Sequence, residues 1–383
     1  MVTLRRGHDL IGGNRLARFT EPGAILGIIG GGVEAYRLVL AAHRLGLQVV
    51  VLSPLPGDIA MQAADMALVG TSSDAAALQQ LADRTTLITY MDENVDSEAL
   101  AAATAPEQLP SGVRILDVVQ DRYLEKVFFE DLNLNILPYA QVVTANDIAK
   151  AVEVVGFPAI LKPIQKSVGQ DQQLRLDTAA DVARAGQLLQ QRPYVLEAWL
   201  DEPQDFTVMV AKAGDSVQVM PLVETKFAGH QLQAAIVPAS GGMPVAKEVT
   251  RIAQVIADKL DYTGVFAIAF YLTANGTLYV KRLYSAPQLN GAVLPAATGA
   301  TPEEVHLRAL LGWPLPNMTR RQPAVTLFLH DTDRSAALTQ LQIKPEWRFR
   351  FYPLNHALLG DVTIIGDRAV VAQQLSATGY FSL

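Results

Sequence analysis

Residues 24–46 read AILGIIGGGVEAYRLVLAAHRLG, in which a short apolar run leads through three glycines into an amphipathic segment. The run AILGIIG has the length of a buried strand, and Glu34–Leu45 carries apolar residues at helical spacing and is closed by Gly46. The strings QVVVLS, DMALVG and TLITY repeat the strand pattern, with helical segments around Ala60 and Ala75. Short apolar strands that alternate with helices predict a parallel α/β sheet with right-handed crossovers.

A different pattern begins at about Asp121, where a predicted helix (Arg122–Leu132) is followed by strand candidates in FPAILKPI and YVLEAWL. The string FTVMVAKAGDSVQVMPLV predicts a hairpin around Gly214, so this second sheet is at least partly antiparallel. The pair Asn275-Gly276 between two apolar runs predicts another hairpin. After WPLPN, the remaining residues alternate like short strands and predict a small end domain.

Composition excludes several classes of function. Half of the 383 residues are hydrophobic, which suits large buried cores, and the net charge of −7 argues against a general nucleic-acid binder. The chain has no cysteine and no apolar run near the roughly 20 residues of a membrane span, and no apolar secretory core follows the N-terminal arginines. The six histidines lack metal-ligand spacing, and no nucleophile elbow surrounds Ser167 or Ser240. We expect a cytoplasmic protein with no disulfide, zinc site, membrane segment or nucleic-acid partner.

The glycines after the first strand offer two interpretations. Gly30, Gly32 and Ala35 meet a loose form of the dinucleotide-binding fingerprint, with helix N-terminal amides available to an anion. The fingerprint also needs an acid at the end of the second strand, and that position is Ser53. The pattern therefore favours a tight strand-to-helix turn that faces a ligand cleft over a nicotinamide site.

A lysine and a glutamate lie in two neighbouring apolar strands. Lys162 in AILKP and Glu197 in YVLEAW are costly to bury unless each meets an opposite charge. One interpretation is a structural ion pair. The other is a nucleotide pocket, with Lys162 on phosphates and Glu197 near the sugar.

Eight strings in one order give the chain a family resemblance. It resembles the 5-(carboxyamino)imidazole ribonucleotide synthases, ATP-grasp enzymes of purine biosynthesis that are also called the ATPase subunit of phosphoribosylaminoimidazole carboxylase. The strings are LGIIGGG (26–32), SPLPGDIAMQAAD (53–65), TYMDENVD (89–96), QDRYLEK (120–126), AILK (159–162), AAIVPA (234–239), YTGVFAI (262–268) and HLRALLGWPLP (306–316). Each string is weak alone, but their common order along nearly the whole chain is specific.

The resemblance implies an ATP-grasp fold with an N-terminal parallel α/β, Rossmann-like domain, a small central lid domain and a small C-terminal domain. The divisions are expected at 1–23 (an N-terminal extension), 24–118 (the α/β domain), 119–200 (the lid region), 201–318 (the catalytic-type region) and 319–383 (a β-rich end domain). The family implies a homodimer.

The resemblance also implies an activity. In the family, ATP and bicarbonate form carboxyphosphate, which carboxylates the amine of aminoimidazole ribonucleotide, so ATP, bicarbonate and that ribonucleotide are the expected small-molecule partners. By position, Arg122 and Lys162 match ATP-phosphate contacts, Glu197 begins the adenine hinge, and Asp205 matches a ribose contact. The same matching places Gly31, Gly32 and Glu93 at the aminoimidazole substrate.

The sequence departs from the family at four places. The family's magnesium-binding acid is Ala269 here, and its Asn-Glu pair on the facing strand is Lys281-Arg282. The glycine-rich lid loop is PIQKSVGQDQQ, with only Gly169, and the substrate-gripping string is QLNGA (288–292). The basic string near the C-terminus falls at about 354–358 and has no arginine or lysine.

These departures keep three functions open. The family carboxylation is the leading interpretation, and the alternatives are a non-catalytic or regulatory nucleotide-binding paralogue and an ATP-grasp ligase for another acid and amine. No catalytic residue is assigned. Because the charge at the metal position changes from −2 to +2, we expect that phosphate affinity is largely independent of magnesium and that ATP turnover is absent or very slow.

Overall fold

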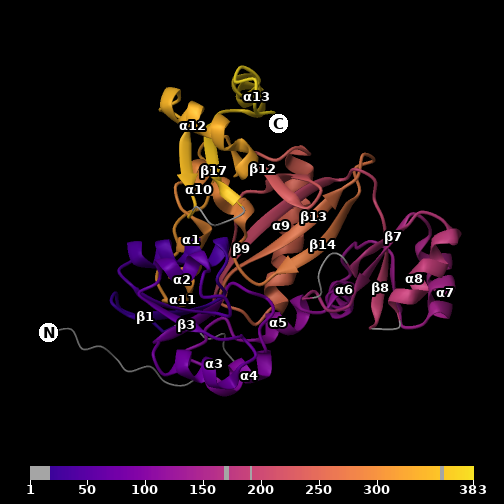
Figure 1. Ribbon diagram of the computed structural model, residues 1–383, viewed down its shortest axis with the longest axis horizontal. Helices are drawn as coiled ribbons and strands as arrows, with labels where there is room; N and C mark the ends of the chain where they lie inside the picture. Colours follow the sequence, from indigo (N-terminus) through magenta and orange to yellow (C-terminus); the bar gives the residue numbers. More distant parts are fainter. Residues whose placement is uncertain (1–17, 168–171, 190–191, 354–357) are drawn as a thin grey trace.

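The computed structural model describes residues 18–167, 172–189, 192–353 and 358–383, and Figure 1 shows how its sheets are arranged. The indigo N-terminal elements lie at the lower left, a small sheet with α7 and α8 lies at the right, and the central sheet lies between them. Gly169 and most of the string at 354–358 fall outside the described residues. Within those ranges, no helix is both long and apolar enough to cross a membrane.

The N-terminal domain contains the predicted parallel sheet. Within the part of the chain described, the strands pair in the order β3-β2-β1-β4 and all pairs are parallel. The strands are β1 (Ile25–Ile29), β2 (Gln48–Ser53), β3 (Met66–Val69) and β4 (Leu87–Tyr90); the helices are α1 (Val33–Arg44), α2 (Ile59–Ala63), α3 (Ala75–Ala82), α4 (Ser97–Ala103) and α5 (Arg114–Val119). The central strands β1 and β2 are buried almost throughout, as expected for a parallel sheet covered on both faces, and the edge strand β4 is also buried.

The turn from β1 to α1 requires glycine at two positions. Gly30 has a φ of +122°, which residues with a side chain rarely adopt. A Cβ added at Gly31 would lie 2.0 Å from the Asp58 carboxylate, which itself accepts a hydrogen bond from Ser53. A tight strand-to-helix turn therefore explains Gly30 and Gly31, as the sequence pattern favoured.

A second sheet begins after helix α6 (Arg122–Asp131). Counting only described residues, it has four strands in the antiparallel order β5-β8-β6-β7. Its elements are β5 (Tyr139–Val142), α7 (Ala145–Val155), β6 (Ala159–Pro163), β7 (Leu174–Leu176), the 3₁₀ turn η2 (Ala179–Asp181), α8 (Val182–Leu188) and β8 (Tyr194–Ala198). Its core contains Ile148 from α7, Leu161 from β6 and Leu196 from β8. We call this sheet, together with helices α7 and α8, the lid sheet.

The central sheet is antiparallel, in the order β14-β13-β9-β11-β12-β15-β17-β16, with β10 paired to β9. Both predicted hairpins are present. The elements are β9 (Gln204–Ala213), β10 (Ser216–Val219), β11 (Val223–Ala228), β12 (Gln231–Val237), α9 (Gly242–Lys259), β13 (Gly264–Leu272), β14 (Leu278–Tyr284), η3 (Leu289–Val293), α10 (Leu294–Thr298) and α11 (Pro302–Leu310). Ile252 and Ile256 of α9 pack with Phe266 of β13 in the largest core.

The C-terminal segment differs from the predicted run of short strands. It contains β15 (Ala324–His330), η4 (Asp331–Asp333), α12 (Arg334–Ile343), β16 (Arg348–Phe351), β17 (Leu358–Ile365) and α13 (Arg368–Ser376). Strand β15 pairs with β12, so these strands extend the central sheet. Helix α12 was missed because it buries small residues, Ala336 and Ala337, which give a weak apolar period.

A buried histidine joins the N-terminal sheet to the central sheet. His306 on α11 accepts a hydrogen bond from the Val265 amide at Nδ1 (2.9 Å), and its Nε2 lies 2.9 Å from Thr89 Oγ1 on β4. Because Nδ1 is an acceptor, Nε2 carries the proton and donates to Thr89. Burial lowers the pKa of His306 to about 4.

We predict that His306 makes stability depend on pH. Because its folded pKa lies below its usual 6.5, the unfolded chain binds an extra proton between these values, and stability falls as the pH drops through this window. Between pH 7.5 and 4.5, urea denaturation should show the parent losing about 2–3 kcal/mol more than His306→Asn, which retains an acceptor. The exposed His230→Asn serves as control, and equal losses in the parent and His306→Asn would contradict this role.

Candidate functional site

A large cavity opens between the N-terminal domain, helix α6 and strand β14. Its volume is about 1090 Å³, and its walls include the turn after β1, the loop after β4, and Lys166 and Arg282. Three residues that the family resemblance places at the aminoimidazole substrate, Gly31, Gly32 and Glu93, all line it. The cavity lies at the carboxyl ends of β1 and β4, where open parallel sheets usually bind ligands.

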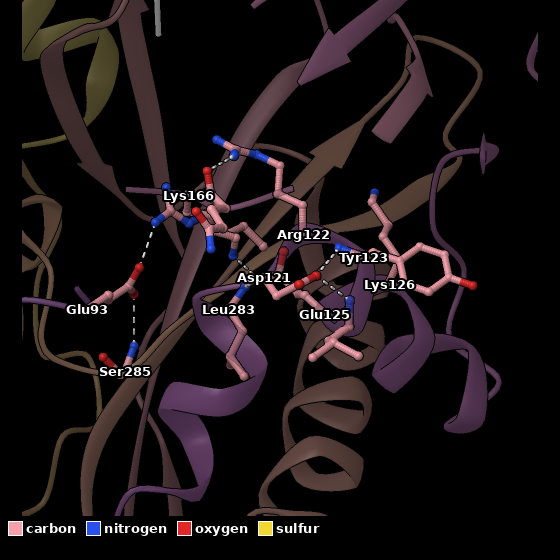
Figure 2. A network of polar contacts seen from close by, with 12 residues as sticks. Glu93, Asp121, Arg122, Tyr123, Glu125, Lys126, Lys166, Leu283 and Ser285 are labelled. Atoms are coloured by element: carbon pink, nitrogen blue, oxygen red, sulfur yellow. Dashed lines mark hydrogen bonds and ion pairs between the residues drawn. The ribbon is translucent and has the colours of Figure 1, made fainter. Parts of the chain in front are cut away.

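Glu93 connects this cavity to β14. Its Oε2 accepts a hydrogen bond from Arg282 Nη2 at 2.7 Å, and its Oε1 accepts one from the Ser285 amide at 3.2 Å (Figure 2). The neighbouring carboxylate raises the pKa of Arg282 against the effect of burial, so the guanidinium stays charged. An acid of the N-terminal domain therefore holds Arg282, the residue that the family resemblance places at a metal position.

A second ion pair lies beside the first. Lys166, from the loop after β6, donates to Glu125 Oε1 at 2.7 Å, and the same oxygen accepts from the Leu283 amide at 2.8 Å. Both side chains are more than nine-tenths buried, and burial lowers the pKa of Lys166 to about 8. Sequence reasoning assigned no role to either residue. The string QDRYLEK contains Glu125, but a lysine in a polar loop carries no signal that it will be buried.

Lys162 and Glu197 meet, as both interpretations required. Lys162 Nζ lies 2.6 Å from Glu197 Oε2, and Lys126 of α6 donates to the other oxygen of the same carboxylate. Burial raises the pKa of Glu197, but the two lysine charges outweigh it and hold that pKa at about 2. The structure therefore contains the predicted ion pair, and Lys126 adds a second lysine to it. Neither Lys162 nor Glu197 lines the large cavity, so whether the trio also binds a nucleotide stays a prediction.

Two predicted ATP contacts remain, Asp205 and Arg122. Asp205 forms an ion pair, whereas Arg122 contacts a backbone carbonyl. Asp205 on β9 accepts from Lys281 Nζ at 2.5 Å, and that ammonium also lies 4.2 Å from the centre of the Tyr271 ring. Arg122 at the start of α6 donates to the Pro163 carbonyl at 2.7 Å. Among the described side chains, no carboxylate lies within ion-pair distance of Arg122. Burial lowers the pKa of Arg122, and the charge of Arg282 lowers it further.

The register of the β13–β14 hairpin allows a test of whether magnesium fits here. Ala269 pairs with Arg282 across the ladder, and Lys281 is the next residue on the same strand. A methyl group and two cationic side chains supply no oxygen ligand, and Mg²⁺ binds through oxygen. No group of three possible metal ligands occurs in the described ranges. As arranged, the residues at this position do not fit a magnesium ion.

Comparison with known proteins agrees with this geometry. Residues 24–120 match the ribonucleotide synthetase preATP-grasp domain, and residues 127–289 match the ATP-grasp domain. The chain is an ATP-grasp protein. A curated relative, the N5-carboxyaminoimidazole ribonucleotide synthase of Bacillus subtilis (strain 168), is 28% identical over 309 residues, which are 80% of this chain and 81% of the relative.

Solved structures extend the likeness to nearly the whole ATP-grasp chain. An N5-carboxyaminoimidazole ribonucleotide synthetase in its ADP complex superposes with a TM-score of 0.87 at 27% identity, covering 95% of this chain and 98% of that one. The Staphylococcus aureus synthetase complexed with ADP gives a TM-score of 0.86 at 25% identity, covering 94% and 98%. The predicted fold and family are therefore confirmed.

We predict that Lys166 stabilises this ATP-grasp site through Glu125. Lys166→Met leaves a buried carboxylate with only the Leu283 amide as partner, so the free energy of unfolding should fall by about 3 kcal/mol. The control is Arg251→Met, which breaks an exposed pair with Glu248 and should cost less than about 1 kcal/mol. Urea denaturation measures both, and equal effects would show that the Lys166–Glu125 pair does not support the fold.

Proposed function

We propose that this chain is an adenine-nucleotide-binding relative of the N5-carboxyaminoimidazole ribonucleotide synthases whose ATP turnover is absent or very slow. One observation carries the proposal: Arg282, paired with Glu93, lies opposite Ala269 in the β13–β14 hairpin, where the family resemblance places metal-binding acids. Phosphoryl transfer normally uses a metal ion to neutralise the charge that develops on the phosphates. Without acids at these positions, the site keeps basic groups for binding but has no place for that ion.

The binding half of the proposal rests on charged side chains of the lid sheet, helix α6 and strand β9. Arg122 and Lys162 would contact phosphates, Glu197 would flank the adenine, and Asp205 would face the ribose, as the family resemblance suggests. Two relatives with the same arrangement of domains are complexed with ADP. Lys162 and Glu197 lie on the paired strands β6 and β8 of the lid sheet, and Asp205 lies on β9 of the central sheet.

A second candidate function is the family reaction itself. The observation in its favour is the large cavity lined by Gly31, Gly32 and Glu93, which suits a ribonucleotide near the site of ATP. The protein would then join bicarbonate to aminoimidazole ribonucleotide at the expense of ATP. A ligase with another acid and amine would keep the nucleotide-binding side chains and differ in this cavity. The homodimer and the cytoplasmic setting remain predictions that come from the family and from composition.

Phosphate release separates these functions. We predict that the purified chain releases phosphate from ATP at less than about 0.01 s⁻¹ with bicarbonate, with or without aminoimidazole ribonucleotide, while ordinary enzymes turn over at about 1 s⁻¹ or faster. Release that requires the ribonucleotide would establish the family reaction. Release with bicarbonate that is unchanged by the ribonucleotide would indicate a ligase for another amine.

We predict that Lys162→Ala weakens ATP binding more than tenfold, or about 1.4 kcal/mol, because it removes a cation that would contact the phosphates. Isothermal titration calorimetry measures the change. Lys150→Ala, an exposed lysine on α7 of the same lid sheet, is the matched control and should bind like the parent. Equal affinities of Lys162→Ala and the parent would exclude Lys162 from the pocket.

A further inference from the structure

We propose that five basic side chains form a polyphosphate-binding site that works without a divalent cation. These residues, the cation belt, are Arg122, Lys126, Lys162, Lys166 and Arg282. The inference rests on the proposed function, because it names the form in which the nucleotide binds: as the free polyphosphate rather than its magnesium complex. It also assigns ligand contacts to Lys126, Lys166 and Arg282, which the family resemblance does not.

The first argument is the balance of charge. The belt has five positive charges and contacts three carboxylates, Glu93, Glu125 and Glu197, so the group carries a net charge of +2. Lys126 and Lys162 share Glu197, and among the described residues no carboxylate lies within ion-pair distance of Arg122. Lys126, Glu125 and Glu197 are buried, whereas Lys162 and Arg282 are partly exposed, so water compensates only part of this charge. Buried charge that lacks a partner is costly. An anion that enters the belt would supply the missing negative charge.

The second argument is that the belt members act on one another. The charge of Arg282 lowers the pKa of both Arg122 and Lys166, and the charges of Lys126 and Arg122 lower that of Lys162. Each of these effects adds to the effect of burial. Such mutual repulsion shows that the five cations lie in one electrostatic environment, which one extended anion can neutralise.

The third argument is the origin of the five residues. Arg122 and Lys126 come from α6, Lys162 and Lys166 from β6 and the loop after it, and Arg282 from β14. Figure 2 shows that Arg122, Lys126 and Lys166 lie near one another, with Glu93 on the other side of Lys166. Lys166 and Arg282 line the large cavity, whereas Lys162 faces Glu197 on the lid sheet. The belt therefore runs from the lid sheet to the cavity, the path that an elongated chain of phosphates would follow.

The belt has the chemistry to replace a dication. Guanidinium and ammonium groups donate charge-assisted hydrogen bonds to phosphate oxygens, and a guanidinium can do so through two nitrogens. On binding, Arg282 would release Glu93 and contact a phosphate, and Lys166 would likewise release Glu125 and contact a phosphate. Magnesium bound to ATP cancels part of its negative charge and so weakens its attraction to the belt. Added magnesium should therefore reduce affinity, the opposite of its usual effect.

Calorimetry of the full chain tests this inference with ATP, ADP and inorganic pyrophosphate, each with a chelator and with excess magnesium. We expect ATP to bind in chelator and to bind at least threefold more weakly in magnesium. Arg282→Gln should weaken the chelator-state affinity about tenfold, and the exposed Arg251→Gln should leave it unchanged. Thermal unfolding confirms that each variant is folded. A triple variant, Ala269→Glu with Lys281→Asn and Arg282→Glu, should bind ATP only with magnesium.

The outcomes distinguish the two proposals. Binding of ATP by the parent only in magnesium would overturn the cation belt while leaving nucleotide binding intact. Binding of pyrophosphate in chelator without any binding of ATP or ADP would support the belt and overturn the proposed function. If none of the three ligands binds in either condition, both proposals are wrong.

Discussion

The hydrogen-bonded register of the β13–β14 hairpin sets Ala269 opposite Arg282, and the charges of the site follow from that pairing. Strand β14 carries Arg282 toward the N-terminal domain, where Glu93 meets its guanidinium. Two backbone amides at the end of this strand also hold acids of the site. The Leu283 amide donates to Glu125, and the amide of Ser285, just after the strand, donates to Glu93. A shift of register by one residue would turn these groups to the opposite face of the sheet.

This arrangement gives an ATP-grasp fold an unusual electrostatic balance. Lys281 forms an ion pair with Asp205, and Lys166 forms one with Glu125. The carboxylates that could attract a metal cation are therefore already paired with side-chain cations. Glu197 has two lysines. Sites that lower the barrier to phosphoryl transfer usually bring metal charge to the phosphates at the moment of reaction. Without a metal ion, the side-chain cations can bind a polyphosphate but do not bring that additional charge to the reaction.

Periodicity predicted most of the fold, because buried strands and amphipathic helices have a strong local signature. The parallel N-terminal sheet and both hairpins were found in this way, whereas α12 was missed because its buried face is alanine-rich. The candidate site was only partly predictable. Lys162 and Glu197 were noticed because charge in an apolar strand is costly, but Lys166 was not, since its burial depends on Glu125 some forty residues away in the chain. Contacts of this kind are set by tertiary packing, which no local pattern records.

The central claim is that side-chain cations take the place of a metal ion at the phosphates. A crystal structure of the chain grown with ATP and Mn²⁺, with anomalous diffraction used to locate manganese, tests it most directly. The account predicts phosphate oxygens within hydrogen-bonding distance of the Arg282 guanidinium and no anomalous peak between the phosphates and β14. A manganese peak at that position, with Arg282 still on Glu93, would contradict it.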